Sequence, residues 1–250
     1  MIPDRTELEW TYEPADFFEV AYRNVQKEYE LVIENGRVVA TLASPQRPVP
    51  DNLHEQIKRC VDSIFLIRQL QVHRICTLQG PRVYQHMAGQ INVDIRLGAA
   101  LRVVASVGTP DIILRDQAGN IVRDTRAERI AADTGMLDSI APKLARSPIL
   151  HEMLMSYSRS ISDPSNELVH LFETRDALRK HYGIIGAART ALNIGRNEWE
   201  RFDTLANEEP FEQGRHRGRN IGGLRAASND ELKEARSIIR KWIIAFAQTV

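Results

Sequence analysis

The stretch YELVIENGRVVATL, residues 29–42, decides the fold of the first part of the chain. Apolar residues alternate with polar ones on both sides of Asn35-Gly36, as they do in strands that bury one face. Asn-Gly suits the type I′ turn, which needs positive φ at both of its central residues. The stretch therefore predicts a β-hairpin over about residues 28–42.

A long amphipathic helix is predicted next, after the proline-rich connector ASPQRPVPD at residues 43–51. From residue 52 the apolar period changes to about 3.6 residues, which predicts a helix of about twenty residues. Its apolar stripe consists of Leu53, Ile57, Cys60, Ile64, Ile67 and Leu70.

Short apolar runs typical of strands return after this helix. They lie at residues 73–78, 91–97, 101–107, 111–116 and 120–124. DQAGN, residues 116–120, separates the last two runs and suggests a second hairpin. Residues 1–124 are therefore predicted to form a small antiparallel sheet with one long helix packed on it.

Residues 125–250 lack strand patterns and predict an all-helical bundle. Asp163 is a candidate N-cap with Pro164 at the first helical position, and Ser228 with Glu231 forms a capping box before the last helix. The buried stripe of that helix is expected to consist of Leu232, Ala235, Ile239, Trp242 and Phe246. The whole chain is thus predicted to be α+β, with domains at 1–124 and 125–250.

The overall composition is ordinary for a globular protein, and its charge is balanced. The chain has 33 basic and 33 acidic residues and is 43% hydrophobic, so any binding of nucleic acid must come from a local patch. We see no signal peptide and no apolar run near eighteen residues, and we expect a cytoplasmic protein without a membrane partner. Cys60 and Cys76 lack metal-ligand spacing and predict buried, unreactive thiols, and we expect no metal and no cofactor.

Several common catalytic motifs are missing from the sequence. HEQIK and HEMLM, at residues 54–58 and 151–155, lack the second histidine of the zinc motif HExxH. P-loop, GxSxG and GxGxxG motifs are also missing. An enzyme built on the N-terminal sheet has little support, because its aspartates have turn positions and no ligand spacing. These aspartates are Asp94, Asp111, Asp116 and Asp124.

Arg175 lies between Leu171 and Leu178 on the apolar stripe of a predicted helix. An arginine in that position is costly unless it is paired or faces a polar cleft. One interpretation is an ion pair with a carboxylate on a neighbouring helix. The other is a cleft in which Arg175 holds an anion, with His181 about one and a half helical turns away for proton transfer.

The segment EQGRHRGRNIGGLR, residues 212–225, concentrates positive charge in a neutral protein. Its glycines would let the backbone approach a ligand closely, and guanidinium groups fit phosphate oxygens. The candidate residues are Arg215, His216, Arg217, Arg219 and Arg225. The alternative is a solvated loop, or a loop that closes on the acidic surface of the protein itself.

Residues 145–250 resemble the HEPN superfamily. The resemblance is carried by Arg175-Asp176 and His181, which match R-[polar]-x4-H, and by the basic loop before the last helix, where Arg215 and His216 are the nearest counterparts. NEEPFEQGRHRG, residues 207–218, also looks like a bacterial family labelled methylamine utilization protein MauJ.

The HEPN resemblance implies a metal-independent endoribonuclease. In such an enzyme the RNA 2′-hydroxyl attacks the adjacent phosphate, histidine transfers protons and arginine stabilises the phosphorane. The resemblance thus implies catalytic roles for Arg175, His181 and His216, RNA or nucleotide phosphate as partner, and a homodimer. Other HEPN proteins are non-catalytic, so the alternative is a scaffold protein that self-associates through its helical bundle.

Overall fold

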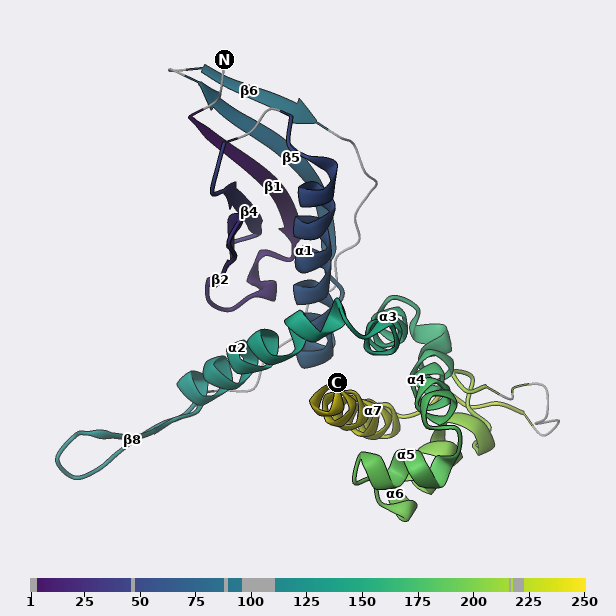
Figure 1. Cartoon of the computed structure of the whole chain (residues 1–250). Helices are drawn as coiled ribbons and strands as arrows, with labels where there is room; N and C mark the ends of the chain where they lie inside the picture. The colour runs from purple at the N-terminus through teal and green to yellow at the C-terminus, as the bar shows by residue number, and fades with distance from the viewer. Residues whose placement is uncertain (1–3, 46–47, 88–89, 96–110, 216, 218–222) are drawn as a thin grey trace. The chain divides into compact units, whose positions relative to one another are not determined.

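The computed structural model of the chain describes residues 4–45, 48–87, 90–95, 111–215, 217 and 223–250. Within these residues the protein is α+β, as predicted, with a sheet in the N-terminal part and most helices in the C-terminal half (Figure 1). The chain forms two compact units. The first consists of Met1–Arg68 and Arg74–Leu137, and the second of Gln69–His73 and Asp138–Val250.

The first unit contains a six-stranded antiparallel sheet in the order β2-β3-β4-β1-β5-β6. Its strands are β1 (Arg5–Glu13), β2 (Tyr22–Val25), β3 (Tyr29–Glu34), β4 (Arg37–Leu42), β5 (Thr77–Met87) and β6 (Gln90–Ile95). A short 3₁₀ helix, η1 (Ala15–Phe17), follows β1. The N-terminal strand β1 lies in the interior of the sheet, between β4 and β5.

The predicted hairpin is confirmed by β3 and β4. Their register pairs Glu34 with Arg37 across a two-residue turn. Asn35 and Gly36 have φ of 47° and 79°, as a type I′ turn requires.

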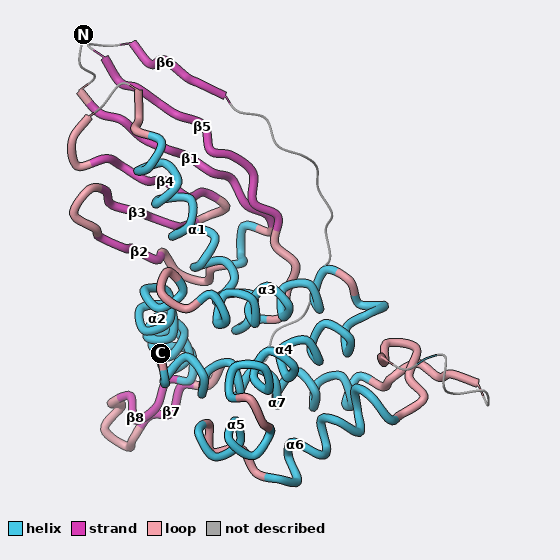
Figure 2. Tube along the Cα trace, turned by 45° about the vertical axis from the view of Figure 1, so that its right-hand side comes forward, coloured by secondary structure: helices cyan, strands magenta, loops and turns pink. Residues whose placement is uncertain are grey.

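The long predicted helix is α1 (Asp51–Val72), which packs along one face of the sheet (Figure 2). Alternate residues of β1, including Leu8 and Trp10, are buried on that face, because successive side chains of a strand point to opposite faces. The residues between them are polar and paired across strands: Glu9 binds Arg37, and Glu7 binds His86 at 2.9 Å.

A second, two-stranded sheet in the first unit confirms the second predicted hairpin. It consists of β7 (Ile113–Arg115) and β8 (Ile121–Asp124). The helix α2 (Thr125–Leu144) begins immediately after β8. The strand predicted at residues 101–107 lies outside the described residues.

The two units divide inside α2, between Leu137 and Asp138. Asp133 of α2 accepts a hydrogen bond from Arg68 of α1 at 2.5 Å, and Arg126 donates to Glu19 at 2.8 Å. These pairs hold the first half of α2 to the sheet unit.

The second unit is a helical bundle, as predicted. Its main helices are α3 (Pro148–Ser162), α4 (Glu167–Tyr182), α5 (Ile185–Ala191), α6 (Arg196–Asp203) and α7 (Asn229–Thr249). It also contains a short 3₁₀ helix, η2 (Pro164–Asn166), and a π-helix, η3 (Thr204–Glu208). The five residues of the predicted α7 stripe are all buried. The capping box of Ser228 and Glu231 is also confirmed, because each residue bonds the other's backbone amide.

A buried ion pair lies in this bundle beside the end of α1. Arg236 of α7 donates to both carboxylate oxygens of Glu167 at 2.5 and 2.7 Å, and Glu167 is 2% exposed. His73 approaches the same carboxylate at 3.8 Å through Nε2, while its Nδ1 lies 3.1 Å from the Tyr157 hydroxyl. Burial and the positive charge of Arg236 lower the pKa of His73 to about 4.

Both cysteines are free and partly buried. Burial raises the pKa of the Cys76 thiol to about 12 and also raises that of Cys60. Both thiols are therefore protonated at neutral pH and weakly nucleophilic. A search of the described helices finds none with the length and apolarity needed to cross a membrane.

Candidate phosphate-binding site

Helix α4 places Arg175 among buried side chains. Arg175 is 9% exposed, and it lies on the same face as Leu171 and Leu178, as the helical period requires. Its Nε and Nη2 each donate to one oxygen of Asp203 on α6, both at 2.9 Å. This two-point geometry is the strongest form of arginine–carboxylate pairing. The sequence left two interpretations of Arg175 open, an ion pair with a neighbouring helix or an anion-binding cleft. The ion pair is present, with Asp203 of α6 as the partner.

A second carboxylate, Asp176, links Arg175 to the basic segment. Nη1 of Arg175 donates to Oδ1 of Asp176 at 3.1 Å. Nη1 of Arg215, from the segment 212–225, lies 3.4 Å from Oδ2 of the same carboxylate. Nε of Arg179, one turn further along α4, lies 3.9 Å from Oδ1. Three guanidinium groups from two distant parts of the chain thus surround one carboxylate.

The phenyl ring of Phe172 also contacts two of these guanidinium groups. Their Cζ atoms lie 4.9 Å (Arg175) and 4.5 Å (Arg215) from the ring centroid. Both distances are within the range of a cation–π interaction. Phe172 is buried, so it fixes the position of Arg215 without competing for a ligand.

Arg215 is held at the start of the basic segment by its backbone. Its amide donates to the carbonyl of Ala206 at 3.0 Å. The amide of Gly214 donates to the carbonyl of Phe211 at 3.0 Å, and a Cβ on Gly214 would come within 3.1 Å of that oxygen. At the other end, Arg225 forms a parallel β-bridge with Phe211. The segment therefore begins and ends at one buried aromatic residue.

Arg217 connects the segment to the start of α4 through neutral acceptors. Its Nη2 donates to the carbonyl of Ser165 at 2.9 Å and to Oδ1 of Asn166 at 2.5 Å. Its Nε donates to the carbonyl of Gly214 at 3.1 Å. These bonds position Arg217, but none of the three acceptors carries a negative charge.

Arg225 is engaged with the first turn of α7. It donates to both carboxylate oxygens of Glu231, at 2.9 and 2.7 Å, and its Cζ lies 4.3 Å from the centroid of Phe211. The hydrogen bonds from Arg225 and from Ser228 lower the pKa of Glu231 to about 2. Arg225 therefore serves the terminus of α7.

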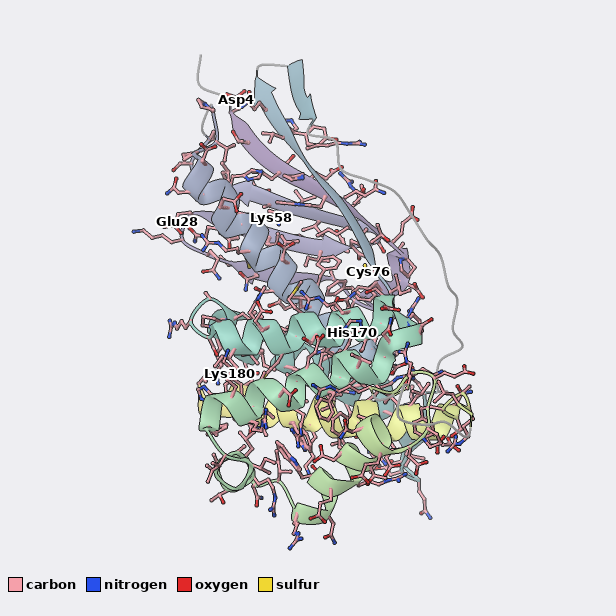
Figure 3. The ribbon with its side chains drawn as sticks, turned by 90° about the vertical axis from the view of Figure 1, so that its right-hand side faces the viewer. Asp4, Glu28, Lys58, Cys76, His170 and Lys180 are labelled. Carbon is pink, nitrogen blue, oxygen red and sulfur yellow. The ribbon has the colours of Figure 1, made fainter. Side chains whose placement is uncertain are left out.

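His181 lies six residues after Arg175, near the C-terminal end of α4. His181 is exposed and makes edge contacts with Tyr182 and Phe246, at centroid distances of 4.7 and 5.2 Å. Six residues of helix advance about 9 Å and turn about 240°, which separates His181 from Arg175. Its neighbour Lys180 marks this C-terminal end of α4 in Figure 3. His216 and Arg219 lie outside the described residues.

The comparisons with protein-family models, curated proteins and solved structures found no match to this chain. The HEPN and MauJ resemblances therefore remain predictions from the residues. Among the described residues, no group of three or more His, Cys, Asp or Glu side chains is arranged to hold a metal ion.

Sequence reasoning did not identify Arg179 or Asp203 as parts of this arrangement. Arg179 has a local signal, since it lies four residues after Arg175 and such pairs share a helix face. Asp203 has none, because it is 28 residues away and reaches Arg175 only through the packing of α6.

Proposed function

We propose that the second unit binds the phosphate groups of RNA or nucleotides at a site formed by Arg179, Arg215 and Asp176. One observation carries the proposal. Arg215 and Arg179 approach the same carboxylate at 3.4 and 3.9 Å, whereas a charge-assisted hydrogen bond is about 2.7–2.9 Å long. Both guanidinium groups therefore have hydrogen-bonding capacity left for an anion.

The exposure of these groups suits a ligand from solvent. The side chains of Arg179 and Arg215 are 55% and 43% exposed, and that of Asp176 is 33% exposed. Arg175 keeps its bond to Asp203, so a phosphate would compete only for the two outer arginines. A phosphate offers more acceptor oxygens than Asp176, which favours the exchange.

For RNA as ligand, we propose that His216 supplies the proton transfer that catalysis needs. His216 directly follows Arg215 in the sequence, whereas His181 lies at the far end of α4. The 2′-oxygen would bond to phosphorus as the P–O5′ bond breaks. His216 would take the proton of the 2′-hydroxyl and deliver it to the departing 5′-oxygen. The products would be a 2′,3′-cyclic phosphate and a 5′-hydroxyl end.

Binding can be tested by fluorescence anisotropy with a labelled single-stranded RNA and the full-length protein at low salt. We expect Arg215→Ala and Arg179→Ala each to weaken binding about fivefold and to reduce the salt slope by about one. Arg196→Ala is the control, because Arg196 is 74% exposed and lies at the start of α6. Competition by a mononucleotide would separate free phosphate ligands from RNA. RNA affinity that both variants leave unchanged would refute the site.

Catalysis needs a separate test, namely incubation of the protein with mixed RNA in EDTA. We expect cyclic phosphate ends to form, and His216→Ala to abolish them. Intact RNA, or cleavage that persists in the double variant His181→Ala/His216→Ala, would refute the proposed catalysis. The proposal of phosphate binding would then stand alone.

A non-catalytic interaction protein is the second candidate, and the pairing of the arginines favours it. Among the described arginines of the segment, Arg217 and Arg225 are engaged with the protein itself. A protein that shows no RNA affinity at low salt but self-associates through its helical bundle would match this function.

A further inference from the structure

Five of the ten exposed large apolar residues in the described part of the chain lie on or beside the hairpin β7–β8. These five residues are about half exposed or more: Ile112 54%, Ile113 52%, Leu114 50%, Ile121 53% and Val122 68%. Because successive residues of a strand point to opposite faces, these exposed side chains lie on both faces of the hairpin. A two-stranded hairpin alone is also only marginally stable.

The outer edge of β7 is free to pair within the described part of the chain, where this sheet has only two strands. Ile112 exchanges bonds with Thr125, and the amide of Asp116 donates to Asn120, so these residues face β8. Backbone groups alternate sides along a strand. The amides and carbonyls of Asp111, Ile113 and Arg115 therefore point away from β8.

The sequence of this edge is self-complementary. Residues 111–115 read Asp-Ile-Ile-Leu-Arg. In an antiparallel pair of two copies centred on Ile113, Asp111 would lie opposite Arg115 of the other copy and Ile112 opposite Leu114. Opposite charges and apolar pairs directly across strands are stabilising. Asp111 would bind Arg115 of the other copy in addition to Arg129 of its own chain, which it contacts at 2.8 Å. Asp111, Ile113 and Arg115, whose backbone groups point outward, are also the residues that would exchange backbone hydrogen bonds with the other copy.

We propose that this edge binds a second copy of the chain and forms a continuous four-stranded antiparallel sheet from the two hairpins. Ile112 and Leu114 of both copies would meet on one face, and the two Ile113 side chains on the other. No lysine or proline occurs in residues 111–116, although such residues commonly protect edge strands from pairing. This dimer needs none of the residues of the phosphate site.

An interface formed by two short strands is small, and small interfaces belong to the weak, reversible class. We therefore expect dissociation constants in the micromolar range. Sedimentation velocity of the full-length protein over about 1–200 µM should show a monomer–dimer equilibrium. Ile113→Pro removes the central outward amide and should weaken the dimer at least tenfold. Arg215→Ala should leave it unchanged, which separates this proposal from the phosphate site.

Charge variants give a second test, in which Asp111→Arg also removes the ion pair between Asp111 and Arg129, at 2.8 and 2.9 Å. Arg115→Asp makes the edge acidic at both ends and Asp111→Arg makes it basic, so each protein alone should be monomeric. An equimolar mixture should restore a dimer, because every charged pair is then opposite in sign. Arg196→Asp changes the charge equally outside the hairpin and should dimerise as the wild type does. A wild-type monomer over the whole range, a dimer insensitive to these changes, or a mixture that stays monomeric would overturn the proposal.

Discussion

Arg175 and Asp203 form a two-point ion pair between α4 and α6, with both hydrogen bonds at 2.9 Å. Their side chains are only 11% and 23% exposed. Removing one partner leaves the other charge in a poorly solvated position. The pair therefore makes Arg175 important for the fold of the second unit, whatever the protein binds.

We expect Arg175→Met to lower the free energy of unfolding by about 3 kcal/mol, at the low end for buried pairs because Asp203 retains some exposure. The double variant Arg175→Met/Asp203→Leu should recover much of this loss, since it leaves no unpaired charge. Urea denaturation monitored by circular dichroism measures both. A single variant as stable as the wild type would contradict this account.

Asp176 should compete with a bound phosphate for Arg179 and Arg215. Asp176→Asn keeps the size of the side chain and removes its charge. We expect a two- to fivefold gain in RNA affinity, the change that about 0.5–1 kcal/mol produces for a partly exposed pair. Asp230→Asn, an equal charge change at the exposed start of α7, should have little effect. Unchanged or weaker binding in Asp176→Asn would count against the proposed site.

His73 should make stability depend on pH in the acidic range. Its pKa is about 4 in the folded protein and about 6.5 when unfolded. The unfolded chain therefore binds the proton more readily, and stability falls as the pH drops from 6.5 to 4. The loss approaches 3 kcal/mol, because each pKa unit corresponds to about 1.4 kcal/mol.

This pH dependence can be measured by urea denaturation between pH 4.5 and 7. His73→Gln should flatten the stability profile in that window, because the side chain at position 73 then no longer takes up a proton. His181→Gln, at an exposed position of α4, serves as the control. A profile that is equally steep with and without His73 would disprove the assignment.

The capping box of α7 should contribute measurably to the bundle. Ser228→Ala removes the side-chain acceptor of the Glu231 amide and should cost about 1 kcal/mol of stability. Thermal unfolding followed at 222 nm measures the effect. Ser228→Thr keeps a hydroxyl acceptor and should lie close to the wild type.

Local signals explain which parts of the fold could be predicted. The Asn35-Gly36 turn and the capping box of α7 are specified by adjacent residues, and both are confirmed. Helix α2 escaped prediction, because it contains Gly135 and Pro142 and has only a weak apolar periodicity. The first half of α2 is held to the sheet unit by Arg68 and Asp133, a contact that spans 65 residues.

In the candidate site, too, only features with a local sequence signal could be predicted. The need of Arg175 for a partner could be read from its position on an apolar stripe, whereas the identity of Asp203 could not. The approach of Arg215 to Asp176 depends on the fold of residues 204–215. The catalytic roles of Arg175, His181 and His216 remain predictions.

Gln69–His73 belong to the helical unit although the chain on both sides belongs to the sheet unit. A fragment cut at residue 125 would lack these five residues, and Tyr157 would lose the imidazole that it contacts in the intact chain. Expression of the bundle by itself should therefore yield a weakened domain, and a synthetic peptide carrying residues 69–73 should help to restore it.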